Sequence, residues 1–254
     1  MLLAITRAVS PAIAHCELTY LERVPIDLPT ARRQHRRYEE VLRSLGVQVH
    51  PLPAEADLPD SVFVEDLAVV LDECAVLTRP GASSRRPEGK SIAAALSPYR
   101  KLIPIQAPAT LDGGDVLAIG KKLYIGRSRR SNAHAQEQMR HLLAPYGYNV
   151  LGVPISGCLH LKSAVTQVSA DTLLLNPDWV DAAAFGGFKV IAIDASEPYA
   201  ANALSIGATV LTQPAFPKTR QILEQAGIRT LLVDESELGK AEGALTCCSL
   251  IFNV

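Results

Sequence analysis

The chain has 254 residues, of which 48% are hydrophobic and 20% are charged, and its 25 basic and 26 acidic side chains nearly cancel. This composition is typical of a folded globular protein and excludes a disordered chain, and the balanced charge excludes a broad basic surface for nucleic acid. Because no uncharged apolar run reaches the roughly 18 residues of a membrane span, we expect no membrane partner and a small-molecule substrate.

The five cysteines favour a reducing compartment. Their number is odd, and they lack the regular spacing of a disulfide framework. No CxxC or HExxH spacing occurs, so the sequence indicates no metal site. Arg7 interrupts the apolar run at the N-terminus before it reaches the length of a signal-peptide core. We therefore expect a cytoplasmic protein.

The first predicted elements are a strand at residues 2 to 8, a helix at 30 to 45 that Gly46 ends, and a strand at 47 to 52. A unit of hairpin, helix and strand then occurs four times, with a period of roughly 40 to 54 residues. The hairpins are predicted at 62–70 with 74–78, 116–119 with 123–125, 163–168 with 172–175, and 203–206 with 209–212. The helices follow at 91–99, 133–144, 179–185 and 219–225, and the strands at 101–106, 149–155, 189–193 and 230–233.

The remaining pieces make a fifth unit if the C-terminal strand, predicted at residues 245 to 252, pairs with residues 2 to 8. Both chain ends then close one ring, and closure removes the exposed edges of an open sheet. The sequence therefore predicts a single domain over residues 1–254, an α/β five-bladed propeller with a central active-site cavity. An open α/β sheet is the alternative, since it also alternates strands and helices.

The C-terminal strand carries a candidate nucleophile at its entrance. A cysteine in a strand is more often a small core residue than a reactive thiol. Neighbouring side chains on a strand point to opposite faces, so Cys247 and Cys248 are expected to differ. One of them is predicted to pack in the core and the other to be available for chemistry.

Several charged residues stand next to the predicted hairpins. Paired acids at the end of a buried strand, as at Glu65 and Asp66, are costly unless they meet a cation. Asp112 and His160 each come just before a hairpin, and equivalent places in a ring of repeats face the same cavity. Arginines follow the second strand of two hairpins, at residues 79–86 and 127–130, where guanidinium groups are suited to bind a carboxylate.

Six segments, taken together and in this order, resemble the dimethylarginine dimethylaminohydrolase family of the guanidine-modifying pentein superfamily. They are residues 63–66, 79–81, 111–115, 124–126, 160–162 and 245–249. The resemblance implies a five-bladed propeller that hydrolyses N-omega-methylated arginines to citrulline and methylamine or dimethylamine. It implies Cys247 as the nucleophile, His160 as the general acid and base, and Asp112 as the carboxylate that orients the histidine.

The resemblance also implies a set of substrate-binding residues. Glu65 and Asp66 would lie at the substrate with Asp60 nearby, Arg85 and Arg130 would hold its carboxylate, Leu18 would lie in a lid, and Ala241 would line the pocket. No metal or organic cofactor is implied. Zinc remains possible as an inhibitor, because a thiolate and an imidazole are two plausible ligands.

Other functions share this set of residues. An arginine deiminase would release ammonia, and an amidinotransferase would pass the amidino group to another amine, although both families have longer chains. A non-catalytic binding protein of the same fold would lack the cysteine. The sequence does not decide between a monomer and a homodimer.

Overall fold

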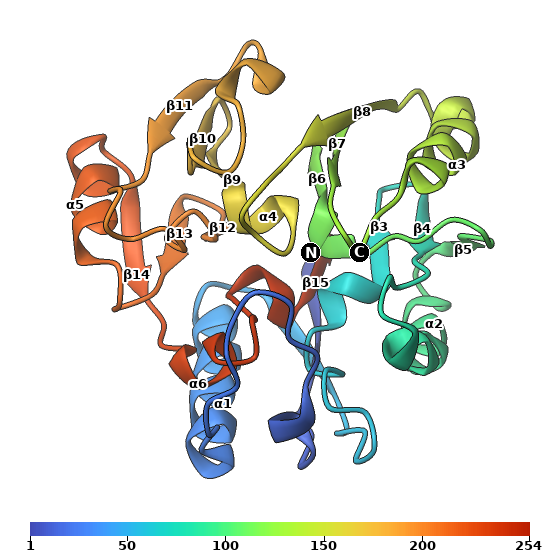
Figure 1. Ribbon diagram of the computed structural model, residues 1–254, viewed down its shortest axis with the longest axis horizontal. Coiled ribbons are helices and arrows are strands. Elements are labelled where there is room, and N and C mark those ends of the chain that lie inside the picture. The colour runs from blue at the N-terminus through green and yellow to red at the C-terminus, as the bar shows by residue number, and fades with distance from the viewer.

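The computed structural model describes residues 1–254 and arranges their strands in five separate sheets of three strands each. In every sheet two antiparallel strands form a pair, and the second of them pairs in parallel with a third strand. Figure 1 shows the five sheets placed around a common centre. The chain thus forms the predicted five-bladed α/β propeller, and the open sheet is excluded.

The sheets follow one another around the ring in chain order. Their strands are β15–β1–β2 (Leu250–Asn253, Leu2–Arg7, Gln48–Leu52), β3–β4–β5 (Ala68–Val70, Cys74–Leu77, Lys101–Pro104), β6–β7–β8 (Val116–Ile119, Lys122–Arg127, Asn149–Pro154), β9–β10–β11 (Val165–Ser169, Thr172–Leu175, Lys189–Ala192) and β12–β13–β14 (Leu204–Ile206, Thr209–Thr212, Arg229–Leu232).

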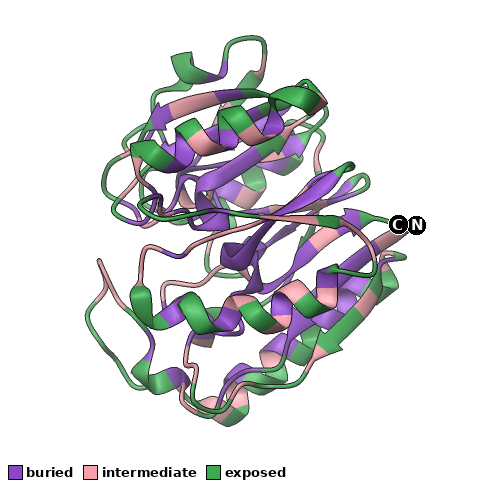
Figure 2. Cartoon of the chain, turned by 90° about the vertical axis from the view of Figure 1, so that its right-hand side faces the viewer, coloured by how far each residue is buried: buried purple, intermediate pink, exposed green.

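Helices make the crossovers to the third strands. The four α-helical crossovers are α1 (Leu28–Ser44), α2 (Gly89–Leu96), α3 (Ala133–Leu143) and α5 (Pro217–Gln225), and the remaining sheet has only the 3-10 turn η6 (Ala182–Phe185). Figure 2 shows buried strands inside and helices whose outer faces are exposed, as expected for elements with one apolar face. None of the helices combines the length and the apolar character needed to cross a bilayer.

The longest helix, α1, shows how local sequence sets these elements. Asp27 caps it by accepting a hydrogen bond of 2.7 Å from the backbone N–H of Thr30, which satisfies one of the free donors at a helix start. Its buried side includes His35, Tyr38 and Leu42, whose spacing places them on one face. This face packs against the first sheet and the C-terminal segment.

The two ends of the chain close the ring. Strand β15 pairs antiparallel with β1, with Phe252 opposite Leu3 and Leu250 opposite Ile5. The N-terminal amine of Met1 also donates to the carbonyl oxygen of Val254 at 3.0 Å, and both ends lie together near the centre of Figure 1. The predicted pairing of the first and last strands is confirmed.

The boundaries of several predicted strands are wrong in the same way. Short helical turns replace the strand starts expected at residues 62, 163 and 245, and the strands begin only at 68, 165 and 250. The turns are η2 (Val64–Leu67), α4 (Leu161–Ala164) and η7 (Thr246–Cys248). A further 3-10 turn, η4 (Gly113–Asp115), precedes β6. These segments are surrounded by protein, so their apolar residues give no periodicity that distinguishes a turn from a strand.

Candidate active site

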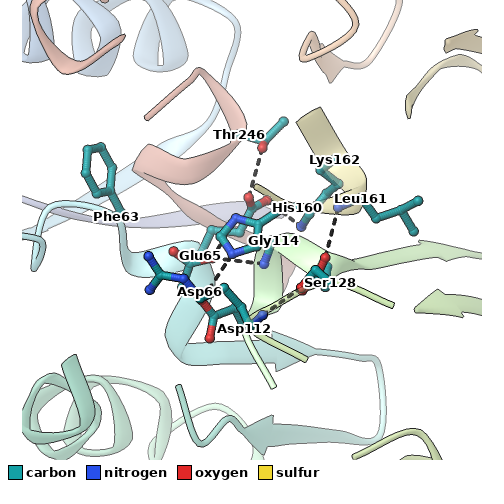
Figure 3. Close-up of polar contacts among 12 residues, drawn as sticks. Phe63, Glu65, Asp66, Asp112, Gly114, Ser128, His160, Leu161, Lys162 and Thr246 are labelled. Atoms are coloured by element: carbon teal, nitrogen blue, oxygen red, sulfur yellow. Dashed lines mark hydrogen bonds and ion pairs between the residues drawn. The ribbon is translucent and has the colours of Figure 1, made fainter. Parts of the chain in front are cut away.

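The four turns that precede the inner strands of four sheets carry the candidate site. Turn η2 holds Glu65 and Asp66, Asp112 comes directly before η4, His160 comes directly before α4, and Cys247 lies within η7. Figure 3 shows the side chains of Asp66, Asp112 and His160 next to one another. The structure thus brings together residues that are up to 182 positions apart only because the sheets form a ring.

His160 is held between two carboxylates (Figure 3). Its Nε2 lies 3.0 Å from Oδ2 of Asp112, and its Nδ1 lies 3.7 Å from Oδ1 of Asp66. Burial disfavours the charged ring, but the charge of Asp66 and the hydrogen bond to Asp112 outweigh burial and raise the pKa of His160 to about 9. The histidine is therefore a cation at neutral pH, and Asp112 is placed to orient it as predicted.

Asp66 is ionised because it has partners on all sides. Nη1 of Arg85 donates to its Oδ2 at 2.5 Å, and the backbone N–H of Gly114 donates to its Oδ1 at 3.0 Å. Desolvation raises the pKa of this carboxyl group, but the charges of His160 and Arg85 outweigh it and lower the pKa to about 2. Asp66 therefore presents a permanent negative charge beside the histidine.

The same contacts give Arg85 a role that the sequence did not predict. Its guanidinium is buried and also donates to Glu88 at 3.0 Å and to the carbonyl oxygens of Asp60 and Phe63 at 3.2 and 3.0 Å. Arg85 is thus the internal counter-ion of two acids. That Arg85 also binds a substrate carboxylate stays a prediction. Nη1 of Arg85 donates to Asp66 alone, so its second N–H is available for that carboxylate.

The double glycine of residues 113 and 114 lets η2, η4 and His160 approach closely. A Cβ on Gly113 would lie 2.0 Å from the carbonyl oxygen of Glu65. A Cβ on Gly114 would lie 2.6 Å from Nδ1 of His160 and 2.8 Å from Oδ1 of Asp66. Any larger residue would therefore separate the carboxylate from the imidazole.

Asp115 was not predicted as a site residue, although it belongs to the segment at 111–115. Its Oδ1 accepts the backbone N–H of Leu161 at 3.0 Å, and its Oδ2 accepts the hydroxyls of Ser128 and Ser131 at 2.5 and 2.6 Å. Burial raises its pKa to about 6, against the lowering effect of the His160 charge. This carboxyl group ties the start of α4 to the loop that carries Arg130.

Cys247 and Cys248 differ in burial as predicted, but alternation along a strand is not the cause. They lie on the 3-10 turn η7 and not on a strand, so alternation of strand faces does not apply. The turn leaves Cys247 half-buried at a cavity that His160 also lines, and it buries Cys248 completely. Burial, followed by the charges of Glu65 and Asp66, raises the pKa of Cys247 above the usual range of a thiol, so the resting side chain is a neutral thiol.

Glu65 is directed away from that cavity. Its Oε1 accepts from Nζ of Lys162 at 2.5 Å, and its Oε2 accepts from the hydroxyl of Thr246 at 2.8 Å (Figure 3). The side chain lines a second cavity together with Lys162 and Thr246. Glu65 thus holds η7 in place, and its direct contact with substrate stays a prediction.

The cavity at Cys247 has a volume of about 20 Å³, which is little more than one water needs. The predicted residues on its wall are Asp60, Asp66, Arg85, Arg130, His160, Ala241 and Cys247. Leu18 does not line it but packs half-buried on the adjoining core cluster. The remaining wall residues are Glu17, Phe63, Leu159, Glu242 and Gly243. An arginine-sized molecule enters only when part of this wall moves.

Residues 17–21 run beside this wall: Glu17 lines the cavity and its backbone N–H donates to Asp60 at 3.1 Å, and Glu242 holds residues 19–21. The two oxygens of Glu242 accept backbone N–H groups of Thr19 at 3.0 Å, Tyr20 at 2.5 Å and Leu21 at 2.7 Å. Nη2 of Arg130 donates to the hydroxyl of Thr19 at 3.1 Å. Glu242 has a φ of +59°, the only positive φ outside glycine. The sequence missed this residue, because only a Glu-Gly pair marks it.

Fold and cavity together define the class of protein. It is an α/β five-bladed propeller, the pentein fold, with a cysteine, a histidine and carboxylates at a central cavity. The N-terminal domain of an arginine dihydrolase from cyanobacteria has the same fold, with a TM-score of 0.89 over 98% of this chain and 97% of that chain at 18% identity.

Closer similarities identify the family. The family model described as N,N dimethylarginine dimethylhydrolase, eukaryotic, matches residues 22–185. The N(G),N(G)-dimethylarginine dimethylaminohydrolase of Streptomyces coelicolor is 38% identical over 97% of this chain and 95% of its own length. The protein of the same name from Pseudomonas aeruginosa is 36% identical over 89% and 90% of the two chains. The chain belongs to the dimethylarginine dimethylaminohydrolase family, and the resemblance drawn from the sequence is confirmed.

Solved structures of this family superpose on 98% of the chain. A cysteine-to-serine variant of the Pseudomonas aeruginosa enzyme, complexed with citrulline, has a TM-score of 0.94 and 33% identity over 98% of both chains. A histidine-to-glycine variant of a dimethylarginine dimethylaminohydrolase, an adduct with S-methyl-L-thiocitrulline, has the same TM-score and identity over 98% and 99%.

The pKa of His160 is the first test of this geometry. We expect its ring to titrate near pH 9 by NMR, and Asp112→Asn to lower the midpoint by about one pH unit or more, because the charged ring loses an opposite charge. The spectrum of His160→Gln identifies the resonance. Because the folded pKa is raised, the stability that the cation contributes is complete below about pH 6.5 and is lost as the pH rises through about 9. A midpoint near 6.5 in the unsubstituted protein would contradict the described clamp.

Gly114→Ala tests the close approach. The new methyl group would overlap His160 and Asp66, both of which are buried and tethered, so we expect a loss of about 1–3 kcal/mol in the free energy of unfolding. Gly89→Ala is the control, since its Cβ would meet nothing within 4 Å and alanine favours the helix that Gly89 begins. Urea unfolding measures both, and equal midpoints for the two variants would refute the argument.

Glu242→Gln tests the closure of residues 17–21. Replacing the carboxylate by an amide removes charge-assisted hydrogen bonds, each worth about 1.5–3 kcal/mol, so the backbone amides of Thr19, Tyr20 and Leu21 should exchange with deuterium about tenfold faster. The exposed Glu22 has no such contact, and Glu22→Gln serves as the control. Unchanged exchange in Glu242→Gln would show that other contacts hold the segment closed.

Proposed function

We propose that this chain hydrolyses N-omega-methylated arginines to citrulline and methylamine or dimethylamine through a covalent thiouronium on Cys247. The observation that carries the proposal is one cavity lined by a thiol, an imidazolium and an ionised carboxylate. The family supports it, since its relatives in Streptomyces coelicolor and Pseudomonas aeruginosa bear the name of this activity. A similar solved structure also holds citrulline, the product that the proposal requires.

Binding begins with the charge of the substrate. Asp66 stays ionised in the cavity wall, so it attracts a guanidinium group and positions it beside His160 and Cys247. Arg130 lines the same cavity, and its hydrogen bond is to the neutral hydroxyl of Thr19. We therefore assign the substrate carboxylate to Arg130 first, with Arg85 behind it.

The substrate itself activates the nucleophile. Burial and the charges of Glu65 and Asp66 keep Cys247 protonated in the resting protein. A guanidinium cation next to the sulfur favours the thiolate, so the thiol proton leaves to solvent when substrate binds. A thiolate is needed because the guanidinium carbon, whose charge is delocalised, is a poor electrophile.

The chemical steps use the two protonation states of His160. The thiolate of Cys247 attacks the guanidinium carbon and forms a C–S bond, which gives a tetrahedral adduct. His160 donates its proton to the methylated nitrogen, the C–N bond breaks, and the amine leaves a thiouronium on Cys247. The now neutral His160 takes a proton from water, and the hydroxide attacks the same carbon. Collapse of this adduct releases citrulline and restores the thiol and the imidazolium.

We further propose that no cofactor takes part, because thiol and imidazole supply both nucleophile and acid. Zinc is proposed as an inhibitor that binds Cys247 and His160, both of which line the cavity. Five free cysteines fit the reducing cytoplasm that the sequence predicts. The proposed active unit is a monomer or a homodimer.

Product analysis with matched cysteine variants tests this function. We expect citrulline and dimethylamine from asymmetric dimethylarginine, citrulline and methylamine from monomethylarginine, and no ammonia from arginine. Cys247→Ser should lower turnover by at least about 10⁴-fold, since it removes the nucleophile, and Cys74→Ser, buried in another sheet, should retain it. Ammonia from arginine would instead indicate a deiminase, and turnover by Cys247→Ser would exclude the proposed intermediate.

A further inference from the structure

A second cluster of metal-ligating side chains lies behind η7. His35 on α1, Glu235 at the start of α6 (Ser236–Gly239) and Cys248 at the end of η7 place a ring nitrogen, a carboxylate oxygen and a thiol sulfur within 4.8 Å of one another. All three side chains are buried, Glu235 and Cys248 completely. Helices α1 and α6 pack together, as Figure 1 shows at the lower left. The reaction proposed above uses none of these residues.

The polar atoms of this cluster lack partners. Neither carboxylate oxygen of Glu235 makes a hydrogen bond, and neither ring nitrogen of His35 makes one of good geometry, the backbone of Arg7 being a weak partner of the ring. Nδ1 of His35 lies 3.9 Å from Oε1 of Glu235, too far for a direct hydrogen bond. Leaving buried polar atoms unpaired is unfavourable. Something between the side chains is needed to offset that cost.

We propose that His35, Glu235 and Cys248 supply three ligands of a buried binding site for Zn²⁺. Nitrogen, oxygen and thiolate sulfur are the ligands that zinc takes, at about 2.0–2.3 Å. The donor triangle is wider than a bound ion requires, so side-chain adjustments on the order of 1 Å close it. A divalent ion, one carboxylate and one thiolate together carry no net charge, which suits a buried position. Binding releases the thiol proton of Cys248, and that of Glu235 where it is protonated, to solvent.

Glu39 extends the arrangement beyond the three ligands. Its Oε1 lies 3.8 Å from Nε2 of His35, on the side of the ring opposite to the proposed ion. The same oxygen accepts the hydroxyl of Thr6 at 2.6 Å, which fixes the carboxylate. A histidine that binds a metal generally directs its second nitrogen at a carboxylate or carbonyl, which orients the ring. At 3.8 Å Glu39 makes no hydrogen bond to the ring, so it would take this orienting role only after the ring shifts toward it.

Occupancy would act on the catalytic turn. Cys248 directly follows Cys247 in η7, and Thr246 at the other end of the turn is already bound to Glu65 at 2.8 Å. A Zn²⁺ on Cys248 would hold the second end. The site was not predictable from the sequence, because its ligands come from residues 35, 235 and 248 and not from a short spacing.

The test separates this site from the active-site thiol by using the Cys247→Ser variant. We expect this variant, produced in cobalt-supplemented minimal medium, to retain about one Co²⁺ per chain after gel filtration. It should show thiolate-to-cobalt charge-transfer absorption in the near ultraviolet and a higher melting temperature than its chelator-treated form. Adding Cys248→Ser should abolish the absorption, and adding Glu235→Gln should reduce cobalt retention at least about tenfold. Adding Cys74→Ser, which removes a buried thiol in another sheet, should change neither.

Two results would overturn the proposal. The first is Cys247→Ser protein without retained metal, which would assign the space between the side chains to water. The second is metal that is retained equally when Glu235 or Cys248 is replaced, which would place it elsewhere. Should Cys248→Ser fail to fold, Glu235→Gln, which keeps the size of the side chain, still decides the question.

Discussion

The pairing of buried charges at the centre of the ring is the constraint on which the site depends. Arg85, Asp66, His160 and Asp112 alternate in sign, and each is shielded from water. A buried charge without its partner is very unfavourable, so the turns that carry these side chains have to meet in one arrangement. The sheets bring the turns near one another, and the charges determine how they fit. The chemistry of His160 is a product of that fit.

Turn η7 holds the proposed nucleophile, Cys247, between two supports. Thr246 binds Glu65, which is itself held by Lys162, and Cys248 is fully buried against the side of α1 that contains His35. Of the residues in this turn, only Cys247 lines the cavity that His160 also lines. The position of one sulfur atom therefore depends on contacts with two other regions of the chain, and neither support takes part in the reaction steps.

The ring was predictable from the sequence because the same order of elements is repeated along the chain. Hairpin, helix and strand recur often enough that errors in single boundaries did not alter the predicted order of elements. The first and last strands pair as predicted. The turns were not predictable, because the residues near Val64 and Thr246 pack on all sides and show no period. The partners of Arg85 and Glu65 were missed for a related reason. Charge type marks a residue as functional, but only folding decides whether it faces another side chain or the cavity.

The closing strand of the ring has a consequence for biosynthesis. Strand β15 leaves the ribosome after every other strand, and β1, its partner, leaves first. Four sheets can form while synthesis continues, whereas the first sheet waits for β15 to complete it. The proposed nucleophile, Cys247, lies in the turn that directly precedes β15, so the ring and the candidate site are completed by the same part of the chain. Closure of the ring and placement of the proposed nucleophile thus depend on the same strand pair, β1 with β15.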